Sequence, residues 1–220
     1  MKKAFTLLEL IFVLVVIGIL STIILSATKS NKLQEAATQV ISHIRYTQHL
    51  AMVDDKFNVN DIVWYKKRWQ IIFGASENAS GKDTGDYIAY SIFSDTAGTS
   101  SGSPNISELA KDPMNNGKYL SGGYSGIIDT YDPKASKKMN IGLTYNVKEV
   151  KFSNSCSSRN SRRLSFDNLG RPIRNPLDGY KKSYIADRLI RNPCIITLTS
   201  ITDENISIVV EPETGYTYIR

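Results

Sequence analysis

The first 28 residues constrain this chain more than any other stretch. Two lysines, Lys2 and Lys3, precede an apolar run in which nineteen consecutive residues, from Leu10 to Thr28, carry no charge. A helix of about 20 apolar residues spans a hydrocarbon core of about 30 Å. Because lysine and arginine mark the cytoplasmic flank of such helices, the run predicts a membrane helix with a cytoplasmic N-terminus. The rest of the chain is then expected on the far side of the membrane.

One carboxylate, Glu9, lies a single turn inside this apolar segment. A charge within the hydrocarbon costs about 2.5–3.5 kcal/mol on insertion scales, so such a residue predicts a functional partner. An alternative is that Glu9 lies at the interface, near the lipid headgroups. A secretory signal peptide and a plain membrane anchor are two further interpretations of the N-terminus, and a carboxylate inside the apolar core argues against the signal peptide.

The string at residues 3–10, Lys-Ala-Phe-Thr-Leu-Leu-Glu-Leu, together with the apolar run, resembles the prepilin signature of type IV pilins and type II secretion pseudopilins. The resemblance implies that a prepilin peptidase cuts between Ala4 and Phe5 and that Phe5 is then N-methylated. It also implies that Glu9 pairs with the N-terminal amine of a neighbouring subunit during assembly. The family usually carries glycine before the cut, where this chain has Ala4.

An amphipathic pattern follows the apolar run. Apolar residues recur at helical spacings and define one face; they are Leu33, Ala37, Val40, Ile44 and Ala51. Because no proline interrupts residues 5–56, we expect one helix from Phe5 to about Val53, about 70 Å long at 1.5 Å per residue. We therefore divide the chain into a leader (1–4), a transmembrane and assembly helix (5–28), an amphipathic continuation (29–56) and a periplasmic globular domain (57–220).

The globular domain is expected to be β-rich, because Ile, Val, Thr and Tyr are abundant after residue 60. A hydrophobic content of 41% indicates a folded domain. The expected strands are Ile62–Tyr65 and Arg68–Phe73 as one hairpin, Tyr87–Phe93, one or two strands in Ile141–Phe152, Arg163–Phe166 and Arg171–Ile173 as a second hairpin, Ile195–Ile201, Ile206–Val210 and Tyr216–Ile219. Residues 94–125 are expected to be mostly loop, with a short helix near Ile106–Ala110. The predicted class is α+β, a long N-terminal helix packed on a C-terminal β-rich domain.

A second resemblance comes from this domain. Trp64 and Trp69, the turn at 166–171 and the hairpin at 210–216 are similar to features of the H-type minor pseudopilins of type II secretion, and of related minor pilins of type IV pili and competence systems. The resemblance implies a pilin-like domain and a minor pseudopilin of a periplasmic filament for protein secretion. The implied partners are prepilin peptidase, other pilins or pseudopilins, the inner membrane and secreted cargo. The alternative is a competence minor pilin that binds DNA for uptake.

The chain has two cysteines, Cys156 and Cys194, without C-x-x-C spacing, which gives little support to a zinc or thioredoxin-type site. If the C-terminal part is extracytoplasmic, the pair can form a disulfide. Such a bridge is worth about 4 kcal/mol in the chain-entropy model. Two buried free thiols are the alternative.

A basic segment separates the two cysteines. It holds nine lysines and arginines against three aspartates, an excess equal to the net charge of the whole chain, +6. Such an excess favours salt-sensitive contact with phosphates, which arginine binds bidentately. The candidate contacts for DNA or phosphate are Arg162, Arg163, Arg171 and Arg174. Residues 170–174 are loosely similar to the Gly-Arg-x-Arg element of DNA-binding minor pilins, with one residue more between the arginines. A solvated basic face, or one paired with acidic neighbours in a filament, is the alternative.

The sequence contains no Ser/His/Asp order, Gly-rich phosphate loop or paired-carboxylate motif that stands out. We therefore expect a non-enzymatic protein without a cofactor. His43 and His49 are six residues apart and do not share a helix face well, so we expect no metal site there. Asp129 and Asp132 lie in a predicted loop, where their oxygens could bind calcium or simply form a solvated turn.

Overall fold

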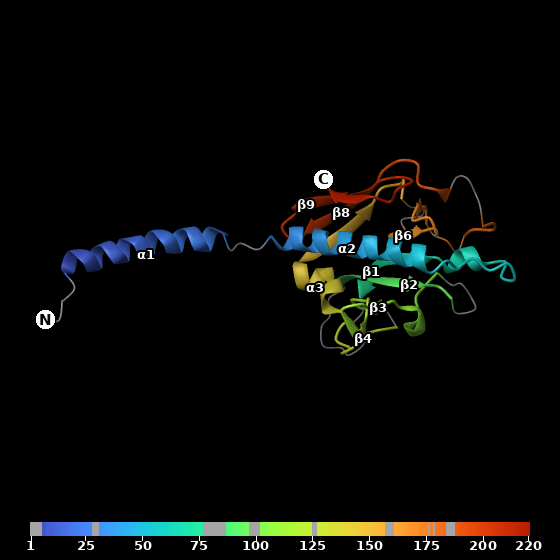
Figure 1. Ribbon diagram of the computed structural model, residues 1–220, viewed down its shortest axis with the longest axis horizontal. Helices are drawn as coiled ribbons and strands as arrows, with labels where there is room; N and C mark the ends of the chain where they lie inside the picture. Colours follow the sequence, from blue (N-terminus) through green and yellow to red (C-terminus); the bar gives the residue numbers. More distant parts are fainter. Residues whose placement is uncertain are drawn as a thin grey trace. The chain divides into compact units, whose positions relative to one another are not determined.

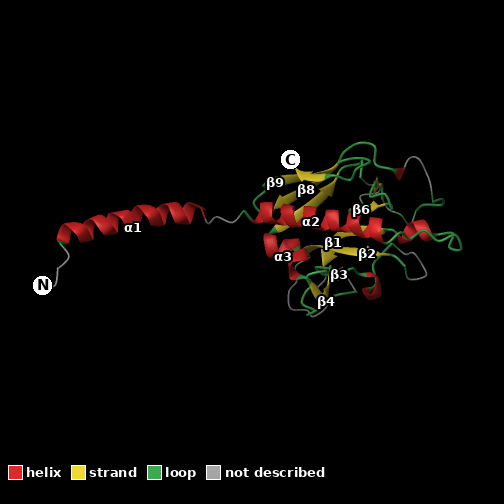
Figure 2. Cartoon of the chain, in the orientation of Figure 1, coloured by secondary structure: helices red, strands yellow, loops and turns green. Residues whose placement is uncertain are grey.

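The computed structural model describes residues 6–27, 31–76, 87–96, 102–124, 127–156, 161–175, 177, 179–183 and 188–220 (Figure 1). The chain divides into two compact units, Met1–Asn31 and Lys32–Arg220. The first contains helix α1 (Leu7–Ala27), and the second contains every other helix and all of the strands. Figure 2 shows that helix and strand are both well represented in the second unit.

The expected continuous N-terminal helix is interrupted in the structure. Helix α1 ends at Ala27 and helix α2 (Lys32–Val53) begins at Lys32. Asn31, directly before α2, is not helical. Asparagine side chains compete with the helical backbone for hydrogen bonds, which makes them poor in helix interiors and common just before a helix begins. The remaining residues between the helices, 28–30, lie outside the described residues.

Helix α2 buries the apolar face that the sequence predicts. All five residues of that pattern are buried, from Ala37, Val40 and Ile44 at full burial to Leu33 at 6% exposed. The helix contacts strands of both main sheets, together with the short helix α3 (Ile141–Tyr145). Figure 1 shows α2 lying across the sheets. This apolar face therefore forms the centre of the domain core, as an amphipathic surface helix requires.

The first sheet has the antiparallel order β2-β1-β6-β7. Its strands are β1 (Trp69–Ser76), β2 (Tyr87–Ser94), β6 (Arg163–Phe166) and β7 (Pro172–Ile173). Trp69 of β1 pairs with Ser94 of β2, and Gln70 of β1 pairs with Ser165 of β6. The strand expected at Tyr87–Phe93 and the hairpin of Arg163–Phe166 with Arg171–Ile173 are confirmed.

The second sheet has the antiparallel order β10-β9-β8-β5. Its strands are β5 (Val147–Phe152), β8 (Cys194–Ser200), β9 (Asn205–Val210) and β10 (Thr217–Ile219). Burial alternates strictly along β8, because successive side chains of a strand point to opposite faces. The three strands expected in the C-terminal region are confirmed.

The hairpin expected from Ile62–Tyr65 is wrong. This stretch is two turn residues followed by the 3-10 helix η1 (Trp64–Lys67). The Val63 amide donates to the Asp61 carboxylate at 3.0 Å, and Lys67 pairs with the other Asp61 oxygen at 2.6 Å. Adjacent Trp64 and Tyr65 are both buried, which a strand with alternating faces cannot achieve beside a single core.

The long connection after β2 is more ordered than expected. It contains the 3-10 helix η2 (Ile106–Glu108), near the short helix that was predicted, and a small hairpin of β3 (Lys111–Asp112) and β4 (Asn115–Tyr119). Single bridges join this region to β2, pairing Ser91 with Ser121 and Phe93 with Leu109. These contacts cover the edge of β2, which would otherwise present unpaired backbone groups.

The stretch expected as one or two strands is a short helix followed by a strand. A 3-10 turn, η3 (Lys137–Met139), leads into α3, and β5 begins at Val147. Asn140 accepts a hydrogen bond from the Leu143 amide, and Asn146 ends the helix with φ 59°. Two asparagines thus set the ends of α3, in agreement with their preference for helix caps and for left-handed backbone.

The buried residues that the structure describes form one main core and two smaller clusters, all within Lys32–Arg220. The main core joins α2 to both sheets, and its largest fully buried side chains include Tyr90, Phe166 and Ile44. One of the smaller clusters packs Trp64 and Tyr65 against Ile173, Leu177 and Tyr180. The predicted α+β class, a helix followed by an antiparallel β-rich region, is confirmed.

Candidate functional site

The first turn of α1 holds Glu9 through a reciprocal cap. The backbone amide and the hydroxyl of Thr6 both donate to Glu9 Oε2 at 3.0 Å, and the Glu9 amide donates to Thr6 Oγ1 at 3.3 Å. This is the capping box that a Thr-x-x-Glu sequence forms at a helix N-terminus. Both Thr6 donors use Oε2, so the same carboxylate can accept a further donor through Oε1. Ala4 and Phe5, the predicted cleavage residues, lie outside the described residues.

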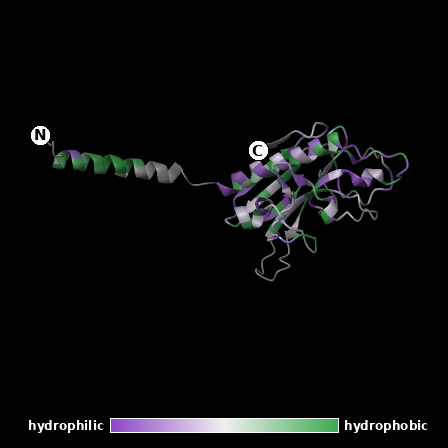
Figure 3. Ribbon diagram, turned by 60° about the horizontal axis from the view of Figure 1, so that its bottom comes forward, coloured by the Kyte–Doolittle hydropathy of each residue, from purple (hydrophilic) through white to green (hydrophobic). Residues whose placement is uncertain are grey.

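Helix α1 is apolar on all sides. Every large apolar side chain from Leu7 to Leu20 is between 37% and 77% exposed, and Figure 3 shows the described part of this helix coloured as hydrophobic. A helix that is apolar all round requires an apolar environment such as lipid or other helices.

Within the residues that the structure describes, no helix is both long and apolar enough to cross a membrane.

Cys156 and Cys194 form a disulfide, with 4.9 Å between their Cα atoms. The flanking residues are joined as well. The Ser153 amide donates to the Ile195 carbonyl at 2.9 Å, and the Ser155 hydroxyl donates to the Pro193 carbonyl at 2.8 Å. The start of β8 and the segment after β5 are therefore held together at several points.

The turn between β6 and β7 engages Arg171. Asp167 Oδ2 accepts from Arg171 Nε at 2.7 Å, and Asp167 Oδ1 accepts from the amides of Leu169 and Arg171. The Asp167 side chain is only 4% exposed. A buried carboxylate that loses its cation is destabilising, so Arg171 has a structural role in this turn.

The other three candidate arginines occupy different places. Arg163 lies on β6, where it pairs with Ile72 of β1. Arg162 borders a cavity of about 420 Å³ beside β5, together with Glu149. Arg174 lines a separate cavity of about 400 Å³ together with Arg191. Arg174 and Arg191 therefore line the same cavity, whereas the four predicted contacts do not share one site.

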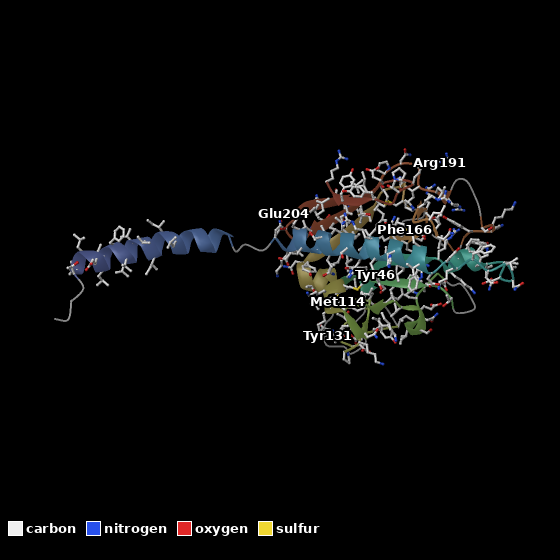
Figure 4. The ribbon with its side chains drawn as sticks, viewed as in Figure 1. Tyr46, Met114, Tyr131, Phe166, Arg191 and Glu204 are labelled. Carbon is white, nitrogen blue, oxygen red and sulfur yellow. A yellow bond between two sulfur atoms is a disulfide. The ribbon has the colours of Figure 1, made fainter. Side chains whose placement is uncertain are left out.

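Two glycine turns meet the C-terminal half of α2 at Gln48, which the sequence did not single out. Gln48 Nε2 donates to the carbonyls of Gly170 and Thr214, both at 2.8 Å. Gly170 and Gly215 have positive φ, 77° and 65°. A Cβ added at Gly215 would lie 2.5 Å from Gln48 Nε2 and 2.8 Å from the Gly170 carbonyl oxygen. Figure 4 shows Phe166, which precedes the first turn, beside α2.

A polar network lies between α2 and the neighbouring elements β2 and α3. His43 Nδ1 and Tyr90 Oη are 2.6 Å apart, Gln39 Nε2 donates to the same Tyr90 Oη at 2.8 Å, and Tyr145 Oη donates to Gln39 Oε1 at 2.9 Å. Burial lowers the pKa of His43 to about 4, and the charge of Asp112, a smaller influence, acts in the opposite direction. Burial also raises the pKa of the Tyr90 phenol. This network fixes α2 against β2 and α3.

The remaining titratable candidates show no metal-binding arrangement in the described ranges. His43 is engaged by Tyr90, whereas His49 is exposed. Asp129 and Asp132 each accept from a backbone amide two residues further on, those of Tyr131 and Lys134. Across residues 6–220 as described, no group of three His, Cys, Asp or Glu side chains could hold a metal ion.

Comparison with known protein families finds a match at the N-terminus. Residues 1–25 match the model of the prokaryotic N-terminal methylation motif. The searches of the curated proteins and of the solved structures found no match to this chain. The match covers the leader, Glu9 and most of α1, and it indicates anchoring at the inner membrane, processing by prepilin peptidase and assembly with other pilins. This N-terminal motif, on a chain with an α+β domain, supports a type IV pilin-like, structural and non-enzymatic protein.

Proposed function

We propose that this chain is a minor pilin-like subunit that is cut between Ala4 and Phe5, N-methylated at Phe5 and moved from the inner membrane into a filament. The match of residues 1–25 to the methylation motif carries this proposal. The uncharged run from Leu10 to Thr28 supports single-pass anchoring in a bacterial inner membrane. The lysines that precede the run support a periplasmic location for Lys32–Arg220.

The exposed surface of α1 supports a role in assembly. Its apolar side chains are covered by lipid before extraction and by neighbouring α1 helices in the filament. Glu9 sets the position of one subunit relative to the next in the filament. Its carboxylate already accepts from Thr6 through Oε2, and it accepts the N-terminal amine of the adjacent subunit in the filament. Burying that charge among apolar helices is favourable only when such a partner is present.

Within this class we propose a minor pseudopilin of a type II secretion filament, of the H type. The resemblance of Trp64, Trp69 and the turns at 166–171 and 210–216 supports this assignment. The β-rich domain would contact partner pseudopilins and secreted cargo, while α1 supplies the filament core. The work of the protein is then filament initiation and cargo contact.

The second candidate function is DNA uptake by a competence minor pilin. The specific observation that favours it is the nine-to-three excess of basic residues between the cysteines. A duplex-binding assay at two salt concentrations separates the two functions, since phosphate contacts weaken steeply with salt. Salt-sensitive binding that is lost in an Arg174→Ala, Arg191→Ala variant supports DNA uptake, and absence of binding at low salt supports secretion.

The assembly role is tested by replacing Glu9 with glutamine, an uncharged side chain of similar shape. We expect Glu9→Gln to leave the β-rich domain folded and to reduce incorporation into filaments, measured in sheared filament fractions. Glu204→Gln is the matched control, because Glu204 is an exposed carboxylate in the turn before β9 (Figure 4). Normal incorporation of Glu9→Gln would contradict the proposed role of the carboxylate.

A further inference from the structure

We propose that the cavity beside the disulfide binds a phosphate group. Its volume is about 400 Å³, and its lining residues are Asn154, Ser155, Arg174, Leu189, Arg191 and Asn192. We call it the Arg174–Arg191 pocket. Among the lining residues that the structure describes, two carry positive charge and none is an aspartate or glutamate. These residues offer hydrogen-bond donors and cations to a ligand.

The chain segments that form the pocket are fixed relative to one another. Asn154 and Ser155 precede Cys156, Arg191 and Asn192 precede Cys194, and the disulfide ties the two stretches together. Arg174 is held by its backbone amide, which donates to the Arg188 carbonyl at 2.7 Å. The neighbouring Asn175 amide donates to the Cys156 carbonyl at 3.3 Å. The pocket is thus formed before any ligand arrives, which lowers the entropic cost of binding.

The chemistry of Arg174 points to an oxyanion. Its Nε is buried and has no hydrogen-bond partner within the described structure, and a buried donor without an acceptor is destabilising. A guanidinium presents its N–H groups in a planar fork that matches phosphate oxygens. The carboxamides of Asn154 and Asn192 can add neutral donors. Figure 4 shows Arg191 on the segment that leads into β8, at the surface of the domain.

Two nearby arginines are engaged elsewhere. Arg171 is bound by Asp167, and the Arg188 guanidinium lies 3.7 Å from the centre of the Tyr180 ring. The Arg174–Arg191 pocket is a cavity that two arginines of the basic segment line together. Its volume falls within the range of about 300–1,000 Å³ typical of small-molecule sites, which leaves room for the group that carries the phosphate.

The ligand is a phosphate group, either free or as a monoester, or within a nucleic-acid backbone. If the ligand is a nucleic-acid backbone, the inference rests on the candidate function in DNA uptake and names a contact site for it. If the ligand is free phosphate or a monoester, the pocket is independent of both proposed functions. Phosphate binding requires no filament, so Glu9→Gln retains it even if assembly fails.

The test is a calorimetric titration of inorganic phosphate into the full chain in a neutral detergent. We expect saturable binding that weakens about tenfold in Arg174→Gln, the change expected for loss of a charge-assisted hydrogen bond. Arg191→Gln should weaken binding similarly. Because Arg191 is exposed, we expect this variant to keep the Tm of the natural chain, and an unchanged Tm separates the loss of binding from a folding defect. Lys111→Gln is the control, since it removes one positive charge from exposed β3 outside the pocket lining.

Absence of saturable binding, or an equal loss in Lys111→Gln, would overturn the proposal. A competition arm identifies the source of the phosphate group. Displacement of bound phosphate by a short DNA duplex supports a backbone phosphodiester as the ligand. Phosphate binding that the duplex leaves unchanged supports a pocket for free phosphate or a monoester.

Discussion

Gln48 joins helix α2 to the turns at Gly170 and Thr214, and we call these contacts the Gln48 junction. They allow a quantitative prediction for Gly215→Ala. A non-glycine residue in left-handed backbone costs about 1–2 kcal/mol, and Gly215 has φ 65°. The added Cβ would lie 2.5 Å from Gln48 Nε2, so this side chain must move and lose its bonds to the carbonyls of Gly170 and Thr214. Each such bond contributes about 1 kcal/mol. The expected loss of unfolding free energy is about 3–4 kcal/mol.

Thermal unfolding followed by near-UV circular dichroism measures this loss in the full chain in neutral detergent. A domain of this size loses about 2–4 °C in Tm per kcal/mol, so Tm should fall by about 6–16 °C. Gly179→Ala is the control, because a Cβ there meets nothing within 4 Å. A second test replaces Gln48 with alanine first, after which Gly215→Ala should cost less. If Gly215→Ala and Gly179→Ala unfold at the same temperature, the proposed junction is not important for stability.

Three further predictions concern His43, the disulfide and the leader. Because burial lowers the pKa of His43 to about 4, the unfolded chain, with a histidine pKa of about 6.5, binds a proton that the folded chain excludes. The contribution of His43 to the unfolding free energy is therefore fully present above pH 6.5, and the unfolding free energy falls by up to about 3 kcal/mol as the pH drops to 4. Urea unfolding at a series of pH values should show this fall, and the fall should be much smaller in His43→Gln. Reducing Cys156–Cys194, which closes a loop with a separation of 38 residues, should lower Tm by several degrees, since such a bridge is worth about 4 kcal/mol; an unchanged Tm on complete reduction would contradict this. Ala4→Gly should be cut by prepilin peptidase at least as fast as the natural chain in a timed co-expression assay, because glycine is the residue that the family usually carries there; slower cutting would argue against a prepilin cleavage site at this position.

Local patterns in the sequence predicted the regular parts of the fold. The spacing of Leu33, Val40 and Ile44 placed the apolar face of α2 correctly, because helical periodicity follows directly from residue order. The alternating stretches that became β8 and β9 were likewise recognisable. The capping box of Thr6 and Glu9 is also a local signal, since Thr-x-x-Glu is visible in the sequence.

Departures from expectation arise where short polar signals outweigh apolar content. Asp61 directs Ile62–Tyr65 into a turn and a 3-10 helix through contacts that span only a few residues. Asn140 and Asn146 set the ends of a five-residue helix inside a stretch that looked like strand. Both aspartate and asparagine were visible in the sequence, but their effect depends on which neighbours become buried.

The candidate functional residues also divide into those that a local motif predicts and those that only the folded structure brings together. The expected cleavage residues and Glu9 belong to a contiguous motif, so the sequence alone could predict roles for them. The Arg174–Arg191 pocket could not be identified, because its residues come from three segments that the disulfide, the pairing of β5 with β8 and the β6–β7 region bring together. The sequence predicts Arg171 as a phosphate contact, whereas in the structure its guanidinium is bound by Asp167.

The most direct test of the account is the mass of the mature N-terminus. The chain is co-expressed with prepilin peptidase, and its N-terminal peptide is identified by mass spectrometry. The account predicts a chain that begins at Phe5 and carries a methyl group on its amine. An N-terminus after the apolar run, as cleavage of a secretory signal peptide would give, or an uncut leader would contradict it.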